Sequence, residues 1–179
     1  IGRWLGRLIL EYFEKNPSQT KNVAYIEGSP GSSYTENLTI GVNEILAGSD
    51  VVILNDRQFA MYDPSRAMTI MEDLLTKYGD RIDLVVAQDG GMFQGAYTAI
   101  EAGGYIGRLG MLCQGQDLIV REKLLSGELY ASVAQDPFTE GSISVEMLDK
   151  LIKGEPVEQW VYTPTGPIYA ETVDNFSWF

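Results

Sequence analysis

Leu84-Val85-Val86-Ala87-Gln88-Asp89 is the most informative stretch of the sequence. Four apolar residues are followed at once by two polar ones, and a segment of helical character comes next. Short, almost fully apolar runs are typical of parallel strands that are covered on both faces. The ending is repeated, because Val-Ala-Gln-Asp also occupies residues 133–136. Strands of this kind are predicted over residues 22–27, 51–54, 84–87, 109–113 and 131–134.

Helical segments alternate with these strands. Residues 2–15 carry apolar side chains at i, i+3 and i+4 spacing, which predicts an amphipathic helix that stops at Asn16-Pro17-Ser18. A second helix is predicted from Ser32 or Ser33 up to Ala47-Gly48-Ser49, and a third opens near Pro64 and includes Tyr78. Further helices are predicted over about residues 91–102, 118–125 and 139–153. Such alternation predicts an α/β protein, with a Rossmann-like, mainly parallel sheet flanked by helices.

The composition excludes several classes of function. The 179 residues carry 13 Lys and Arg against 25 Asp and Glu, a net charge of −12. This balance argues against nucleic acid as a partner, because a phosphate backbone needs a basic surface. The absence of histidine excludes a Ser-His-Asp triad, a histidine base and histidine-ligated metals. The single cysteine, Cys113, is expected to be a buried structural thiol. We therefore expect no metal, no cofactor and no enzymatic activity.

Polar residues follow the predicted strands at the edge where open parallel sheets bind ligands. They are Asn55-Asp56, Gln88-Asp89, Gln114 to Asp117, and Gln135-Asp136. Side-chain amides and carboxylates both donate and accept hydrogen bonds, which suits a small, neutral, hydroxyl-rich molecule. The alternative is that these residues are loop polar groups and helix caps. The loop residue Tyr62 has the same two interpretations, because it could stack on a sugar or cover the edge of the core.

Several segments in order resemble one family over residues 22–156. They are Val23-Ala24-Tyr25-Ile26-Glu27-Gly28-x-x-Gly31, Tyr62-Asp63-Pro64, Val86-Ala87-Gln88-Asp89, residues 127–135 and residues 151–157. Together they are similar to the carboxyl-terminal lobe of the type I periplasmic sugar-binding proteins, the ribose-binding-like group. The resemblance implies one lobe of a two-lobed fold, in which a hinge joins the lobes and a solute is clamped between them.

The same resemblance implies a division of the chain. Residues 1–135 would form the carboxyl-terminal α/β lobe. Residues 136–179 would form a crossover helix and tail that pack on an amino-terminal lobe missing from this chain. An apolar helix face left uncovered in this way favours a partner lobe or self-association.

The family's ligand contacts carry over to some positions. Tyr62 matches the stacking aromatic, Asp89 stands where the family has a ligand-binding Asn, and Gln135 matches an amide contact. Tyr62, Asp89, Gln114 and Gln135 are therefore the predicted ligand-binding residues.

Three positions depart from the family pattern. The Asn-Asp pair that follows the third strand in the family is Asp89-Gly90 here. Leu38 stands where the second helix normally offers an Arg to the sugar. The Asp after the fourth strand is replaced by Gly115, or by Gln114 if one residue is gapped, with Gln116 as the other candidate. The loss of an Arg and a carboxylate removes two charge-assisted contacts, so an unusual polyol, a modified sugar or another solute is expected.

The function implied by the resemblance is solute binding for an ABC-type uptake system. The protein would act with the membrane subunits of the transporter outside the cytoplasm, in the periplasm or as a lipoprotein on the cell surface. The alternatives are the effector-binding domain of a lactose-repressor-type transcription regulator and a receptor module that presents a bound solute to a membrane sensor. A hydrolase or kinase is disfavoured, because no nucleophile and base pair is visible.

Overall fold

A computed structural model describes residues 1–17 and 20–179, so Ser18 of the predicted helix stop lies outside the described residues. The centre is a sheet of seven strands in the order β2-β1-β4-β5-β6-β7, with β3 also paired to β1. Every pairing is parallel except that of β6 with β7. The strands are β1 (Asn22–Glu27), β2 (Val52–Ile53), β3 (Gln58–Phe59), β4 (Leu84–Ala87), β5 (Gly110–Gln114), β6 (Ala131–Val133) and β7 (Pro167–Ile168).

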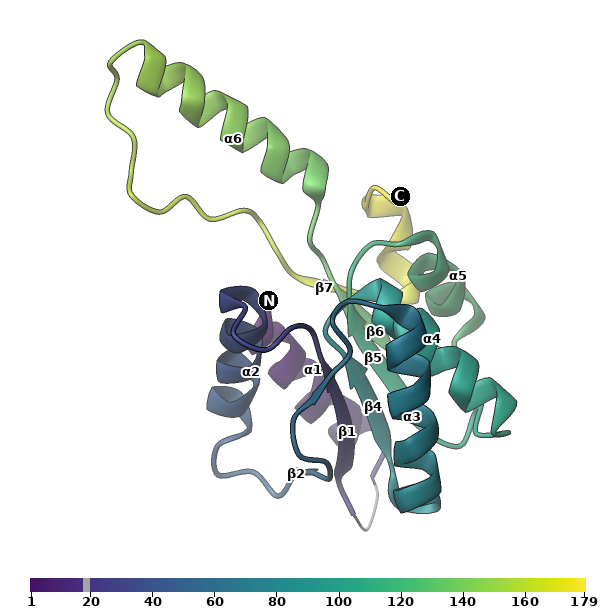
Figure 1. The fold of residues 1–179 in the computed structure, drawn as a ribbon. Coiled ribbons are helices and arrows are strands. Elements are labelled where there is room, and N and C mark those ends of the chain that lie inside the picture. Colours follow the sequence, from purple (N-terminus) through teal and green to yellow (C-terminus); the bar gives the residue numbers. More distant parts are fainter. Residues whose placement is uncertain (18–19) are drawn as a thin grey trace.

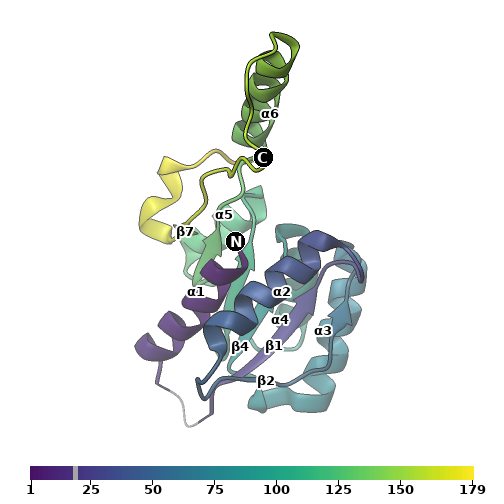
Figure 2. The ribbon, with the colours of Figure 1, turned by 90° about the vertical axis from the view of Figure 1, so that its left-hand side faces the viewer.

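Helices cover both faces of the sheet (Figure 1). The pair α1 and α2 packs on one face, and α3, α4 and α5 pack on the other (Figure 2). The α-helices are α1 (Gly2–Lys15), α2 (Ser33–Leu46), α3 (Pro64–Tyr78), α4 (Gly90–Ala102), α5 (Leu118–Ser126) and α6 (Pro137–Ile152). Two short 3₁₀ helices, η1 (Gly79–Arg81) and η2 (Ala170–Asn175), complete the chain.

Two cores result from the alternation of side chains along the strands. Val23 and Tyr25 of β1 point to the core under α1 and α2, whereas Ala24 and Ile26 point to the core under α3, α4 and α5. Successive strand residues face opposite sides of a sheet, so a strand that is apolar throughout must be covered twice. This is the reason why the central strands lack a polar face, and the predicted α/β fold is confirmed.

The helices α1 and α2 cross at close range. A Cβ atom on Gly2 would lie 2.4 Å from the Leu38 carbonyl oxygen, and one on Gly41 would lie 2.8 Å from the Arg3 nitrogen. Glycine at both positions lets the two backbones touch. Leu38 is 3% exposed at this crossing. It is therefore part of the packing at the position where the family pattern has an Arg.

The structure differs from the sequence prediction at the shortest elements. The strands β3 and β7 were not expected, because two residues are too few to show a period. The predicted strand over residues 51–54 is reduced to Val52–Ile53, and the predicted strand over residues 109–113 is shifted by one residue to Gly110–Gln114.

Helix α6 and the chain that follows it extend away from the sheet (Figures 1 and 2). We call residues 137–165 the arm. No residue of α6 is buried. The chain then returns to the lobe, where β7 pairs with β6, and Ile168 and Val173 are buried in the core. Residues 167–179 therefore pack on this lobe, and the division of the chain at residue 135, with residues 136–179 against a second lobe, stays a prediction.

Both ends of the arm are fixed beside the end of β6. The Thr165 hydroxyl donates to the Ala134 carbonyl oxygen at 2.6 Å, and the Ala134 N–H donates to the Gly166 carbonyl oxygen at 2.8 Å. In the part of the chain that the structure describes, no helix has the length and the apolar character that crossing a membrane would require.

Candidate functional site

The carboxyl ends of β4, β5 and β6 open on a hollow of about 470 Å³. Its polar lining comes from the loops after these strands and from the first turn of α6, and glycines, Pro137 and Phe179 complete it. The polar residues are Asp89, Gln114, Gln116, Asp117, Gln135 and Glu140. Three of the four predicted ligand-binding residues, Asp89, Gln114 and Gln135, are thus brought together, and Tyr62 is not among the lining residues.

Tyr34 joins two of these residues, and the sequence analysis missed it. Its hydroxyl oxygen lies 2.6 Å from the side-chain oxygen of Gln135 and 3.0 Å from the amide of Gln114. The side-chain oxygen and nitrogen of Gln114 both find hydrogen-bond partners when the nitrogen donates to the Tyr34 hydroxyl and to the Gln88 carbonyl, at 3.0 and 2.9 Å. Burial raises the pKa of Tyr34, and the neighbouring Tyr62, Glu140 and Asp89 raise it further.

Gln88 supports the site from within. Its side chain is fully buried, and its oxygen accepts from the Gly28 N–H at 2.9 Å. Its nitrogen donates to the Tyr25 hydroxyl at 3.0 Å and to the Thr39 hydroxyl at 2.9 Å. Burial raises the pKa of Tyr25 to about 12. Because every polar atom of Gln88 is engaged, this residue joins β1, α2 and β4 beneath the hollow and fixes the backbone that leads into Asp89.

Tyr62 lies on a neighbouring part of the same edge. It follows β3 with a φ of +58°, in the left-handed region that a tyrosine seldom adopts. Its hydroxyl lies 2.7 Å from the Thr35 hydroxyl, and its ring covers Gly28, where a Cβ atom would approach the ring to 2.3 Å. The side chain remains 38% exposed. The interpretation of Tyr62 as a stacking aromatic stays a prediction.

Two carboxylates stand at the helix N-termini that face the hollow. Asp89 is the N-cap of α4 and accepts from the Met92 N–H at 2.6 Å. Burial raises the pKa of Asp89, and the charge of Asp117 raises it further. Burial also raises the pKa of Asp117, which is the N-cap residue of α5 but makes no side-chain capping hydrogen bond. The hollow is therefore lined by carboxylates at helix N-termini.

Gln116 is the other candidate for the lost carboxylate position. Its side-chain nitrogen donates to the Ser177 carbonyl at 2.8 Å. Its side-chain oxygen is buried and has no hydrogen-bond partner among residues 1–17 and 20–179. A buried polar atom without a partner is costly, so this oxygen calls for a donor.

A second unpredicted group braces the amino end of α2. Glu27, at the end of β1, is 2% exposed and accepts from Arg57 at 2.6 Å and from the Thr39 hydroxyl at 2.6 Å. Arg57 also bridges to Glu36 of α2. The buried carboxylate is thus paired and hydrogen-bonded, as burial of a charge requires.

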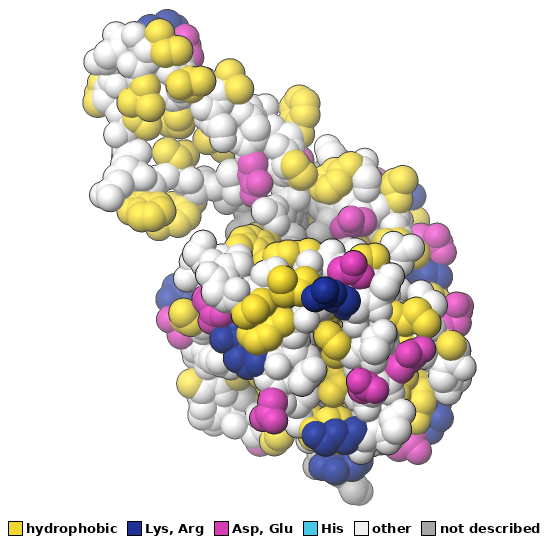
Figure 3. Space-filling view, viewed as in Figure 1, with side chains coloured by type: hydrophobic (Ala, Val, Ile, Leu, Met, Phe, Trp, Pro, Cys, Tyr) yellow, Lys and Arg dark blue, Asp and Glu magenta, His cyan; other side chains and the backbone are white. Residues whose placement is uncertain are grey.

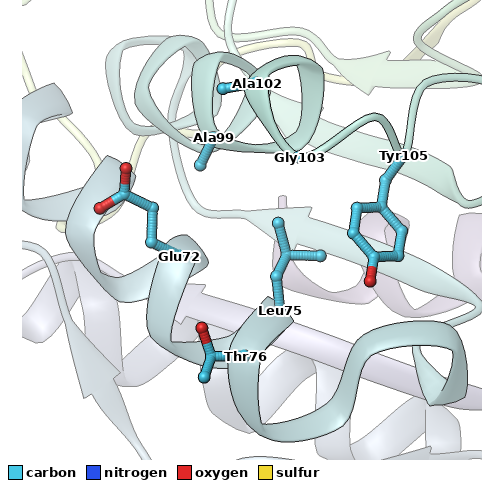
Figure 4. A pocket seen from close by; sticks show the side chains of 7 residues that line it. All are labelled: Glu72, Leu75, Thr76, Ala99, Ala102, Gly103 and Tyr105. Atoms are coloured by element: carbon cyan, nitrogen blue, oxygen red, sulfur yellow. The ribbon is translucent and has the colours of Figure 1, made fainter.

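Other parts of the structure carry less chemistry. A hollow of about 430 Å³ lies between α3 and α4, lined by Leu75, Ala99 and Tyr105 among others, and none of the predicted site residues borders it (Figure 4). The expected burial of Cys113 is confirmed, and burial raises the pKa of its thiol. The described residues contain no cluster of three or more Asp, Glu, Cys or His side chains placed to hold a metal ion.

Sequence comparison finds similar proteins whose names refer to the binding of ribose and of xylitol. The ribose import binding protein of Salmonella typhimurium is 28% identical over 155 residues, which cover 86% of this chain and 51% of that protein. The xylitol-binding protein of Mycolicibacterium smegmatis is 29% identical over 159 residues, covering 86% of this chain and 43% of that protein. The chain therefore spans about half the length of the curated relatives it matches.

Solved structures with a similar fold are also solute-binding and sugar-binding proteins. An ABC transporter solute-binding protein from Bacillus halodurans, solved with bound myo-inositol, superposes with a TM-score of 0.86 at 26% identity, covering 98% of this chain and 60% of that chain. A galactofuranose-binding protein superposes with a TM-score of 0.87 at 21% identity, covering 97% of this chain and 60% of that chain, and shows the same fold. Residues 1–156 match the family described as the periplasmic binding protein domain, and the chain belongs to that family.

Proposed function

We propose that this chain is the carboxyl-terminal lobe of a solute-binding protein that serves an ABC-type uptake system. The observation that carries the proposal is the convergence of Asp89, Gln114 and Gln135 on one hollow at the ends of three neighbouring parallel strands. Their amides and carboxylate can donate to and accept from the hydroxyl groups of a small sugar or polyol. The relatives named for ribose and xylitol, and the complex with myo-inositol, support this class of ligand.

The arm supports a second lobe as the partner of this one. The arm exposes apolar side chains along α6 and along the chain that follows it (Figure 3). The most exposed are Phe138, Val145, Leu151, Ile152, Trp160 and Tyr162. Apolar surface of this extent favours association, and an amino-terminal lobe, in the half of the relatives' length that this chain does not span, would cover it. Without that lobe, two arms would associate with each other.

The mechanism follows from two lobes that meet over the hollow. A solute held by Gln114, Gln135 and Asp89 would also contact the second lobe, so binding would favour the closed arrangement. Closure excludes water and strengthens each hydrogen bond. The lobe would bind and release the solute unchanged, outside the cytoplasm, and deliver it to the membrane subunits of the transporter.

Calorimetry on the full-length native protein tests the proposal with a panel of a pentose, a hexose and a polyol. Binding of at least one of them in one-to-one stoichiometry is expected. Gln135→Leu removes an amide from the hollow and is expected to lower the affinity about tenfold, since buried hydrogen-bond partners would be left unpaired. Gln94→Leu, on the exposed face of α4, is the matched control and leaves the affinity unchanged. A folded protein that binds none of the panel would contradict the proposal.

A further inference from the structure

The Gln135 side-chain amide is held by two neighbouring side chains. Gln135 follows β6 and lines the hollow. Its amide lies 2.6 Å from the Tyr34 hydroxyl oxygen and 2.9 Å from the Gln114 amide, and these are its only hydrogen-bond contacts in the described part of the chain. A half turn of an amide exchanges its oxygen for its nitrogen, and so an acceptor for a donor. Whatever fixes this amide therefore decides which of the two a solute meets.

Gln114 is fixed by the main chain. Its nitrogen donates to the Gln88 carbonyl oxygen at 2.9 Å, and its oxygen accepts from the Gly115 N–H at 3.2 Å. A carbonyl only accepts and an N–H only donates, so these two partners hold the Gln114 amide in one orientation. The Gln135 side chain has no main-chain partner of this kind among residues 1–17 and 20–179. Without the Tyr34 hydroxyl, a single contact, the one with Gln114, would hold its amide.

Tyr34 is placed to provide the second contact. It is the second residue of α2 and is half-buried. Burial raises its pKa above the ordinary value, and the neighbouring Tyr62, Glu140 and Asp89 raise it further, so its hydroxyl keeps its proton at neutral pH. Leu38, one turn further along α2, is 3% exposed and packs against α1. Helix α2 therefore reaches the lining of the hollow through Tyr34, and not through the position where the family pattern has an Arg.

We propose that Tyr34 is a positioning residue for the solute site. Its hydroxyl fixes the Gln135 amide against Gln114, and thereby decides whether the hollow offers the solute a donor or an acceptor at Gln135. A group that is already held in place loses little freedom when a ligand binds, so fixing the amide raises affinity as well as selectivity. The inference rests on the proposed function and adds to it the residue that sets one of its hydrogen-bond contacts.

NMR of the side-chain amides in the full-length native protein tests the positioning before any solute is added. The Gln135 signal is identified as the one missing from Gln135→Leu. In Tyr34→Phe its heteronuclear NOE is expected to fall toward that of Gln94, an exposed glutamine of α4. Tyr78→Phe is the matched control and should leave the signal unchanged, because the Tyr78 hydroxyl donates to the Leu54 carbonyl at 2.7 Å and Tyr78 does not line the hollow. An equally rigid Gln135 amide in Tyr34→Phe would overturn the inference.

Calorimetry on the same protein tests the consequence for binding, with ribose, glucose and xylitol as probes. For the tightest-binding of the three, Tyr34→Phe is expected to lower the affinity about fivefold in the parent. In the Gln135→Leu background the same change is expected to lower it less than about twofold, because the effects of two residues that act as a unit do not add. Tyr78→Phe should leave the affinity unchanged. Equal losses in both backgrounds would show that Tyr34 does not act through Gln135, contrary to the inference.

The inference and the proposed function fail in different ways. A folded parent that binds none of the three probes contradicts the proposed function, and the NMR comparison then still decides whether Tyr34 fixes the amide. A parent that binds a probe, and binds it as tightly after Tyr34→Phe, keeps the proposed function and loses the inference.

Discussion

The Tyr34 hydroxyl oxygen lies 2.6 Å from the side-chain oxygen of Gln135, although 101 positions separate the two residues in the sequence. The contact joins the start of α2 to the loop that leads from β6 into the arm. Tyr34 therefore takes up hydrogen-bonding capacity of both Gln114 and Gln135.

Removal of the Tyr34 hydroxyl is expected to destabilise the lobe. Tyr34→Phe leaves the amides of Gln114 and Gln135 without one partner, and the free energy of unfolding is expected to fall by about 1 kcal/mol. Urea denaturation followed by circular dichroism measures the change. Tyr162→Phe is the control, because Tyr162 is 86% exposed and its hydroxyl is already in water. Equal stability of the two variants would show that the Tyr34 network adds nothing.

The space beside Asp117 gives a second prediction. Gly90→Ala places a methyl group where the Asp117 carboxylate lies and must push it aside. The affinity for the solute is expected to fall several-fold. The higher helix propensity of Ala, about 1 kcal/mol over Gly in a helix interior, offsets at most part of the cost of moving the carboxylate. Gly141→Ala, in α6, is the matched control, since nothing lies within 4 Å of its Cβ atom and it does not line the hollow. An unchanged calorimetric affinity in Gly90→Ala would remove Asp117 from the binding site.

Asp117 also predicts a dependence of stability on pH. Burial raises its pKa in the folded lobe above the ordinary value of 3.8, so the folded lobe binds more protons than the unfolded chain, and this residue lowers stability as pH rises. Asp117→Asn is therefore expected to unfold at higher urea concentration than the parent at neutral pH. The advantage should vanish as pH falls below about 4, where Asp117 is protonated in both states.

The control for this pH series is Asp50, whose pKa is lowered in the folded lobe, so that its effect on stability changes with pH in the opposite direction. A hydrogen bond from Lys21 lowers the pKa of Asp50, so this pair adds stability above the ordinary pKa of Asp50 and loses it as the pH falls. Asp50→Asn should leave stability slightly reduced at neutral pH, because the pair lies at the surface. A gain from Asp117→Asn that is the same at every pH would contradict the assignment to its charge.

Because the arm does not pack on the lobe, we expect substitution of a leucine on the arm to change stability less than substitution of a leucine in the core. Leu124 is a fully buried residue of α5, and Leu124→Ala is expected to lower the free energy of unfolding by about 2–5 kcal/mol. Leu148, 57% exposed on α6, is expected to cost less than about 0.5 kcal/mol. Urea denaturation compares the two variants. A large loss in Leu148→Ala would mean that the arm is packed against something in this chain, such as a second copy.

The sequence predicted the architecture well because the central strands are long enough to show their burial. The bounds of β1, β4 and α1 agree with the prediction, and the strand ends led correctly to Asp89, Gln114 and Gln135 as neighbours. Tyr34 was missed because nothing in its local sequence distinguishes it, and its partners lie 80 and 101 positions away. The bond of the Tyr62 hydroxyl to Thr35 was likewise hidden, because it depends on how α2 lies over the β3 loop.

The return of residues 167–179 to the lobe could not be predicted from the sequence for a similar reason. The returning chain has no period, since β7 has two residues and η2 is a 3₁₀ helix of six residues. Its attachment depends on tertiary contacts, namely the pairing of β7 with β6 and the burial of Ile168 and Val173. Neither contact leaves a local pattern from which it could be read.

The two attachments of the arm lie at one place, where Thr165 and Gly166 bind Ala134. Because the arm is attached only there, we expect a rotation of its far end to change the backbone of the residues at this attachment. Gln135 is the next residue after Ala134. We therefore expect a movement of the arm to change the orientation of the Gln135 side-chain amide. A solute that fixes Gln135 would therefore also restrict the directions in which the arm can point.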